Sequence, residues 1–225
     1  MGFDYDKSSK VNYKVYNHYS HIEIWQDKLF LANHDGDIYL FNLNKIYKKD
    51  FKKKKISSNL NTLSEPPFYG LKDILVDNNK LYISYVAEQK KDCLSIFISV
   101  ADINTKNLNF KNFFSPEECV NADDTLYKKI HPGQAGGRLA KYNNNKILLT
   151  TGNFRSPKVS QDIKSIYGKT LSINENNNFE ILSLGHRNPQ GLYTDGNVII
   201  QTEHGPYGGD EINLILPGGN YGFPI

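Results

Sequence analysis

The chain has 225 residues, of which 39% are hydrophobic and 23% are charged, so it carries enough apolar side chain to bury a substantial core. Its 27 Lys and Arg residues nearly balance its 24 Asp and Glu residues, which argues against a dedicated nucleic-acid-binding protein. No segment approaches the roughly 18 consecutive apolar residues of a membrane-spanning helix, and no secretory signal is visible near the start of the chain.

Paired runs of β-branched and aromatic residues recur along the chain, and a short polar turn joins the two runs of each pair. The pairs are 22–25 with 29–32, 74–76 with 81–85, 139–142 with 147–150, and 191–194 with 198–201. Turns of Asn, Asp and Gly between such runs predict β-hairpins. Further strands are expected at 37–41 and 94–100, and no helical periodicity competes with them.

The spacing of these hairpins favours a β-propeller. Their turns, at Lys28, Lys80, Lys146 and Asn197, lie 52, 66 and 51 residues apart, and four strands in about 40–50 residues are typical of a propeller blade. The longest interval indicates an insertion around 104–130. A β-sandwich is the alternative, because its strands also arrive as successive hairpins. We predict an all-β chain with about four blades across 1–225, as part of a longer protein.

Cys93 and Cys119 are the two cysteines of the chain, so only one intramolecular pairing exists. In an exported protein they would form a disulfide, and in a cytosolic protein they would stay free and buried. Neither has a second Cys or His two to four residues away, so the spacing does not indicate a zinc site.

Residues 185–224 combine glycine-rich turns with polar side chains. Exposed carbonyl groups in such turns, together with the adjacent Asp210 and Glu211, offer the hard oxygen ligands that calcium prefers. Arg187 and Asn188 suit a planar ligand with several negative charges, because a guanidinium group binds carboxylates bidentately. Loops held together by Arg–Asp pairs are the structural alternative.

Three strings in this region resemble signatures of the soluble glucose/sorbosone dehydrogenase family: GHRNPQGL at 185–192, EHGPYGGDEINLI at 203–215 and PGGNYGFP at 217–224. Weaker resemblances are GGRL at 136–139 and SQDIKSIYGKTLSI at 160–173. The resemblance implies a six-bladed propeller that uses pyrroloquinoline quinone and Ca²⁺ to oxidise a sugar, with the C-terminal blades missing from this chain. It also implies a periplasmic or secreted location, and it does not identify the electron acceptor.

The resemblance further implies roles for individual residues. Arg187 would hold the quinone and stabilise the oxyanion that develops on hydride transfer. The other cofactor-binding residues would be Asn188 and Asp210, the backbone carbonyls of Gly205 and Pro206 would bind the catalytic calcium, and Glu211 with Tyr221 would form a second, structural calcium site. His186 would be a packed or hydrogen-bonded histidine.

The chain departs from the family at the positions that handle the proton. The family's general base lies four residues before the arginine of the GGRL-like string, and Gln134 stands there. Its supporting aspartate corresponds to Asn153, and Phe68 and Tyr69 stand directly before Gly70, where a polar cofactor contact is expected. Glutamine cannot abstract a proton near neutral pH. His131, three residues before Gln134, is the candidate replacement base.

Two functions therefore follow from the sequence. The first is a quinone- and calcium-dependent dehydrogenase that oxidises an aldose or related sugar. The second is a catalytically inactive, calcium-binding propeller of the same lineage that binds a sugar or a protein partner. Function depends on the site rather than on the fold, so resemblance alone does not decide between them.

Overall fold

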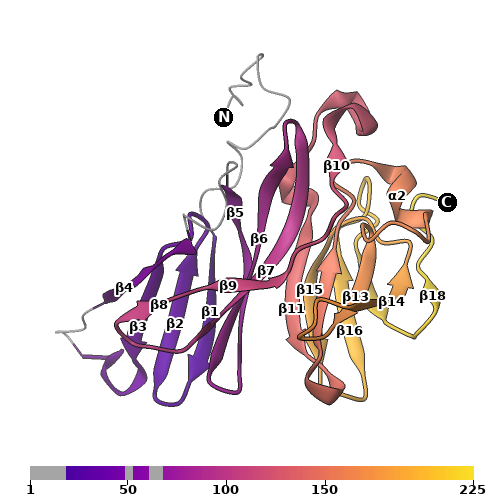
Figure 1. The fold of residues 1–225 in the computed structure, drawn as a ribbon. Coiled ribbons are helices and arrows are strands. Elements are labelled where there is room, and N and C mark those ends of the chain that lie inside the picture. Colours follow the sequence, from indigo (N-terminus) through magenta and orange to yellow (C-terminus); the bar gives the residue numbers. More distant parts are fainter. Residues whose placement is uncertain (1–18, 49–52, 61–67) are drawn as a thin grey trace.

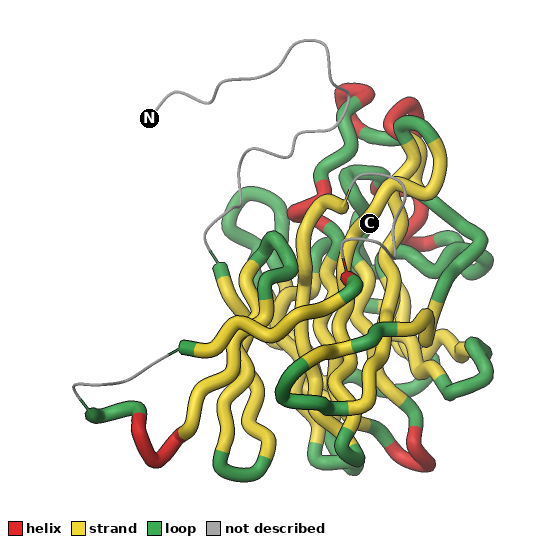
Figure 2. Tube along the Cα trace, turned by 60° about the vertical axis from the view of Figure 1, so that its left-hand side comes forward, coloured by secondary structure: helices red, strands yellow, loops and turns green. Residues whose placement is uncertain are grey.

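A computed structural model describes residues 19–48, 53–60 and 68–225 of the chain. Strands make up most of this part, and its helices are short and lie in the connections (Figure 2). Four sheets follow one another along the chain and fan out side by side from the N-terminal to the C-terminal end (Figure 1). No helix in the described part of the chain is long and apolar enough to cross a membrane.

The sheets are mainly antiparallel meanders. The first has the order β1 (Ser20–Trp25), β2 (Lys28–Asn33), β3 (Ile38–Asn42), β4 (Lys54–Ser58) and β8 (Asn107–Leu108). The second has the order β10 (Val120–Asn121), β7 (Cys93–Asp102), β6 (Lys80–Lys90) and β5 (Phe68–Asp77), and β9 (Lys111–Phe114) also pairs with β7. The third has the order β11 (Gly136–Lys141), β12 (Ile147–Thr151), β13 (Lys169–Ile173), β14 (Phe179–Leu184) and β18 (Gly219–Asn220). The fourth comprises β15 (Pro189–Thr194), β16 (Ile199–Glu203) and β17 (Glu211–Leu214).

Six short helical turns lie entirely within the described residues, one of them α-helical and five of them 3₁₀. They are α2 (Pro157–Gln161), η1 (Leu43–Lys45), η2 (Ala122–Asp124), η3 (Leu126–Lys128), η4 (Pro132–Gln134) and η5 (Asn143–Asn145).

The four predicted hairpins are confirmed as β1–β2, β5–β6, β11–β12 and β15–β16, the first two strands of successive sheets. Four sheets arranged as propeller blades exclude the two-sheet sandwich. The predicted insertion at 104–130 holds three short strands, β8, β9 and β10, of which β8 returns to the edge of the first sheet and pairs parallel with β4. The connection between the second and third blades therefore also closes the outer edge of the first.

Apolar side chains fill the space between neighbouring sheets. Phe30 and Ile38 of the first sheet pack with Leu71 and Ile83 of the second in one buried cluster. A second cluster joins the second sheet to the third, and a smaller one, containing Leu148 of β12 and Ile199 of β16, joins the third to the fourth. Face-to-face packing of amphipathic sheets around apolar side chains thus holds each blade against the next.

The two cysteines pair. Cys93 and Cys119 form a disulfide with a Cα–Cα distance of 5.5 Å. Cys93 opens β7, and Cys119 directly precedes β10, the strand that pairs with the start of β7. The bond fixes the end of the insertion to the sheet that the insertion leaves.

The first strands of the four sheets lie next to one another, since β1 contacts β5, β5 contacts β11, and β11 contacts β15. Arg138 of β11 connects all four. Its Nε donates to the Gln190 carbonyl of β15 at 2.6 Å. Its Nη1 lies 2.8 Å from His21 Nδ1 of β1 and 3.3 Å from Asp73 Oδ1 of β5. The second oxygen of Asp73 accepts the Leu139 backbone N–H at 2.9 Å.

We expect Arg138→Gln to lower the free energy of unfolding by about 2 kcal/mol, because the largely buried Asp73 carboxylate loses its cationic partner and the Gln190 carbonyl loses a charged donor. Urea denaturation measures this change. The control is Lys146→Gln, which removes the partner of the exposed Glu180 and should cost less than about 1 kcal/mol. Equal losses in the two variants would show that Arg138 does not tie the blades together.

Candidate functional site

Two loops of the third blade, around residues 134 and 153, pair with each other at the candidate site. The Gly152 N–H donates to the Ala135 carbonyl at 2.7 Å, and the Phe154 N–H donates to the Gln134 carbonyl at 2.9 Å. A Cβ atom on Gly152 would lie 2.2 Å from the Gln134 carbonyl oxygen, so only glycine permits this approach. The pairing holds Gln134 next to Asn153.

The same loops contact the start of the fourth blade. The Asn153 N–H donates to the Arg187 carbonyl at 3.0 Å, and the His204 N–H donates to the Asn188 carbonyl at 3.1 Å. The Arg187 guanidinium donates from Nη1 to the His204 carbonyl at 3.0 Å. Segments around 134, 153, 187 and 204, which are far apart in the sequence, are thereby assembled by backbone hydrogen bonds.

These segments border a cavity of about 300 Å³, named here the amide–arginine cavity. Its lining residues are Leu126, Tyr127, Gln134, Asn153, Arg155, Pro157, Arg187, Pro206, Tyr207 and Phe223. Four of the residues that the sequence singled out are therefore together in one lining: Gln134, Asn153, Arg187 and Pro206. The lining holds two guanidinium groups and three aromatic rings, and it contains no carboxylate.

Arg155 is the charged residue of the cavity that sequence reasoning missed. Both Phe154 and Arg155 have left-handed backbone conformations, with φ of 51° and 71°. This conformation is uncommon for bulky residues and is found at sites where the surroundings enforce it. No pattern in the sequence predicts a left-handed turn here, so the sequence alone did not place Arg155 beside Arg187.

His131, the candidate base, lies outside this lining. It is buried, with 4% of its surface exposed, and it directly precedes η4. Burial, together with the positive charges of Arg155 and Lys72, lowers the pKa of His131 to about 4. Its imidazole is therefore neutral near pH 7 and is a weaker base than an unperturbed histidine.

Asn188 and Asp210, predicted to contact the cofactor, lie outside the lining of the amide–arginine cavity. Asn188 is buried and its Oδ1 accepts the Gly136 N–H at 3.3 Å. Asp210 is exposed, accepts the Gly205 N–H at 3.1 Å and lies 3.4 Å from His204 Nδ1.

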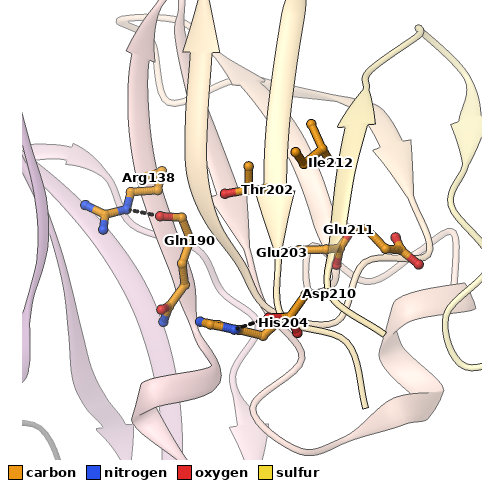
Figure 3. Close-up of a pocket in the computed structure, with 8 residues that line it drawn as sticks. All are labelled: Arg138, Gln190, Thr202, Glu203, His204, Asp210, Glu211 and Ile212. Carbon is orange, nitrogen blue, oxygen red and sulfur yellow. Dashed lines mark hydrogen bonds and ion pairs between the residues drawn. The ribbon is translucent and has the colours of Figure 1, made fainter. Parts of the chain in front are cut away.

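Asp210 and Glu211 instead line a second, larger cavity of about 530 Å³ beside Arg138 and Gln190. Figure 3 shows Gln190, Thr202 and Glu211 along the fourth sheet, with Arg138 of the neighbouring β11 hydrogen-bonded to Gln190 and with His204 beside Asp210.

The residues predicted to bind calcium make separate hydrogen bonds within the protein. The Pro206 carbonyl accepts the Gly209 N–H at 3.1 Å in a tight turn. The Tyr221 hydroxyl accepts the Leu216 N–H at 2.8 Å and donates to the Leu214 carbonyl. Within the ranges that the structure describes, no three His, Cys, Asp or Glu side chains form a group that could hold a metal ion.

A fully buried network lies directly behind Arg187. His186 Nδ1 is 2.8 Å from Glu203 Oε1, and His186 Nε2 is 2.8 Å from Ser183 Oγ. The other Glu203 oxygen accepts the Arg187 backbone N–H at 2.8 Å, and the Tyr221 ring stacks on the imidazole with a centroid distance of 4.8 Å. The order Ser–His–Glu resembles a hydrolase triad. Ser183 and His186 have no exposed surface, so the network supports Arg187 and does not meet a substrate. The prediction of a hydrogen-bonded His186 agrees with this arrangement.

Comparison with known proteins identifies the family of the chain. The family model "Glucose / Sorbosone dehydrogenase" matches residues 17–225, and the chain belongs to this family. It is 44% identical over 77 residues to quinoprotein glucose dehydrogenase B of Acinetobacter calcoaceticus, a match that covers 28% of this chain and 16% of that protein. It is 35% identical over 106 residues to aldose sugar dehydrogenase YliI of Escherichia coli, covering 40% of this chain and 29% of that protein.

Solved structures give the same fold. A crystal structure of a glucose dehydrogenase superposes with a TM-score of 0.74 at 21% identity, covering 91% of this chain and 62% of that one. The PQQ-bound form of aldose sugar dehydrogenase from Streptomyces coelicolor superposes with a TM-score of 0.68 at 21% identity, covering 88% and 59%. The chain thus spans less than two thirds of the length of these relatives.

The buried carboxylate of Glu203 provides a test of the network behind Arg187. Burial raises its pKa, but hydrogen bonds from His186 and the Arg187 N–H, with the charge of His186, outweigh burial and hold the pKa below the ordinary value of 4.5. We expect Glu203→Gln to cost about 2 kcal/mol of unfolding free energy at pH 7, because these donors lose a charged acceptor.

The pH dependence of this loss follows from the sign of the shift. The unfolded chain takes up the proton first as pH falls, so the stability due to the carboxylate is present above about pH 4.5 and is lost as pH falls through the lower native pKa. The difference between the wild type and Glu203→Gln in urea denaturation should therefore shrink in acid. Glu180→Gln, at an exposed position, is the control. A difference that did not change with pH would contradict the buried anion.

Proposed function

We propose that this chain forms the cofactor-binding part of a pyrroloquinoline quinone-dependent sugar dehydrogenase. The amide–arginine cavity supports this, because two guanidinium groups without a lining carboxylate favour an anionic ligand, and three aromatic rings favour a planar one. The donor set therefore fits a planar quinone that bears carboxylates. The family membership and the quinoprotein relative support the same cofactor.

The chain's own residues would bind and orient this cofactor. When bound, the quinone would supply the hydride-accepting carbonyl. The Arg187 guanidinium, held by the His204 carbonyl, would stabilise negative charge at a cofactor oxygen. Tyr127, Tyr207 and Phe223 line the cavity and would stack on the planar faces of the cofactor, which would cover the exposed rings of Tyr127 and Tyr207. Asn188 would act indirectly by fixing the loop that carries Arg187.

Calcium fits this cavity only in part. The carbonyls of Gly205 and Pro206 would supply neutral oxygen ligands, and Ca²⁺ takes six to eight oxygen ligands, usually with some negative charge among them. No carboxylate lines the cavity, so the anionic groups of the cofactor would complete the site. Asp210 as a cofactor contact, and the second calcium site at Glu211 and Tyr221, remain predictions.

Proton removal from the sugar is the step for which the cavity offers no obvious base. Gln134 and Asn153 line it at the positions where the family resemblance expects a histidine and an aspartate, and both amides are neutral. This observation favours a second candidate function, a propeller that binds the cofactor or a sugar without turnover. In the enzyme, His131 would take the role of base after a rearrangement of the loop before η4.

The protein would act outside the cytoplasm, since a disulfide between Cys93 and Cys119 is typical of oxidising compartments. Further blades would complete the propeller. The outer faces of the terminal sheets support this, because Ile22 and Ile24 of β1, and Ile212 and Leu214 of β17, are exposed, and such apolar faces are ordinarily covered.

The experiment is a titration of the full-length protein that contains this chain with pyrroloquinoline quinone and Ca²⁺, followed by glucose, with the absorbance of the cofactor as the readout. The proposed enzyme binds the cofactor and reduces it when the sugar is added. His131→Ala should then slow reduction by at least about 100-fold, as expected for loss of a general base, with cofactor affinity unchanged.

Binding without reduction would instead support the non-catalytic function. In that case Gln134→His combined with Asn153→Asp should introduce sugar-dependent reduction, because it supplies a base and a supporting carboxylate. Absence of cofactor binding would overturn the enzyme, and absence of both cofactor and glucose binding would overturn the second function as well.

A further inference from the structure

The proposed function counts the guanidinium group of Arg155 in the positive charge of the amide–arginine cavity but assigns it no acceptor. The backbone of Arg155 is fixed on both sides, because its N–H donates to Asn153 Oδ1 at 3.0 Å and its carbonyl accepts the Leu126 N–H at 2.8 Å. Among the described residues, its side chain has no hydrogen bond or ion pair. A guanidinium carries five N–H donors, and here the scaffold positions them without giving them an acceptor.

The second guanidinium of the cavity is only slightly better satisfied. Arg187 donates to one neutral acceptor, the His204 carbonyl. Burial and the nearby charge of Arg155 both lower the pKa of Arg187, although Asp210 and Glu203 act in the opposite direction. Glu203 is committed to His186 and to the Arg187 backbone N–H, and Asp210 lines the other cavity. Two like charges thus share one lining that contains no anion.

Two guanidinium groups in one cavity repel each other in the free protein, and an anionic ligand that binds there removes this repulsion. Two arginines around a cavity of about 300 Å³ can each bind a carboxylate or a similar anion bidentately. One anionic group would neutralise only one of them. The cavity is also small and aromatic, so the two anionic groups belong on a compact, planar framework.

We propose that Arg155 is a second anion-binding residue of the amide–arginine cavity, so that two anionic groups occupy the cavity together, one at each guanidinium group. This deepens the proposed function, on which it rests for the identity of the ligand. The shared chemistry is a carboxylate, and it has two sources. Either one polycarboxylate cofactor spans Arg155 and Arg187, or the cofactor meets Arg187 while the carboxylate of a sugar acid meets Arg155.

Calorimetric titrations with three probes test the inference: pyrroloquinoline quinone, the planar benzene-1,3,5-tricarboxylate, and the monoanion benzoate. We expect the tricarboxylate and the quinone to lose at least tenfold in affinity in Arg155→Gln, while benzoate changes less than twofold. Arg155→Lys, which keeps the charge, should recover part of the loss. Lys158→Gln is the matched control, since it removes one positive charge from the same segment at an exposed position paired with Asp124, and it should change no affinity by more than twofold.

The remaining outcomes decide whether the second carboxylate comes from the cofactor or from a sugar acid, and they separate the proposed function from the inference about Arg155. If Arg155→Gln spares quinone binding but weakens glucuronate binding to the quinone-loaded protein tenfold, the second anion belongs to the sugar. If the wild type fails to bind the quinone but binds the tricarboxylate in an Arg155-dependent way, the proposed function fails and this inference stands. If a folded Arg155→Gln, with an unchanged melting temperature, binds both polycarboxylates and glucuronate like the wild type, the inference is overturned.

Discussion

The position of Arg138 across the four inner strands is the constraint on which the rest of the structure depends. Apolar packing between sheets is not directional, whereas the Arg138 hydrogen bonds fix how the inner strands sit relative to one another. The same residue reaches the site, because its acceptor Gln190 donates from Nε2 to the Gly133 carbonyl at 2.9 Å. Gly133 directly precedes Gln134. Blade geometry and cavity geometry are therefore set by one connected group of polar contacts.

A second polar framework holds the other side of the cavity. Lys169 is fully buried, and its ammonium group donates to the Val159, Ser160 and Tyr167 carbonyls at 2.7, 3.1 and 2.7 Å. Two of these carbonyls belong to α2, and the Ser160 hydroxyl donates to the His186 carbonyl at 2.7 Å. Buried polar groups are tolerated only when they are satisfied. These buried polar groups around Arg187 have hydrogen-bond partners, and such a network holds Arg187 in a defined position.

The sequence was sufficient to predict the hairpins because alternation and turn residues are local signals. It was also sufficient to gather Gln134, Asn153 and Arg187 into one site, but only through resemblance to a family, since no local pattern relates positions so far apart. Arg155 was missed because its place depends on a left-handed turn that the Gln134 loop and η3 enforce. Asp210 was expected at the cofactor through the same family resemblance; its side chain accepts the Gly205 N–H and lines the larger cavity, and its role at the cofactor stays a prediction.

The two neutral amides of the cavity, Gln134 and Asn153, leave the positive charge of its two arginines without a compensating anion. The family resemblance expects an aspartate at the position of Asn153, and a carboxylate there would offset the charge of Arg155 two residues later. With an amide in its place, the lining keeps two guanidinium groups and loses its anion. Burial is the main cause of the lowered pKa of the nearby His131, and the charge of Arg155 lowers it further, so the same charge would also disfavour protonation of a histidine in the cavity. The substitutions that weaken base chemistry therefore strengthen the attraction for an anionic ligand, and affinity for polyanions and loss of turnover should vary together at this site.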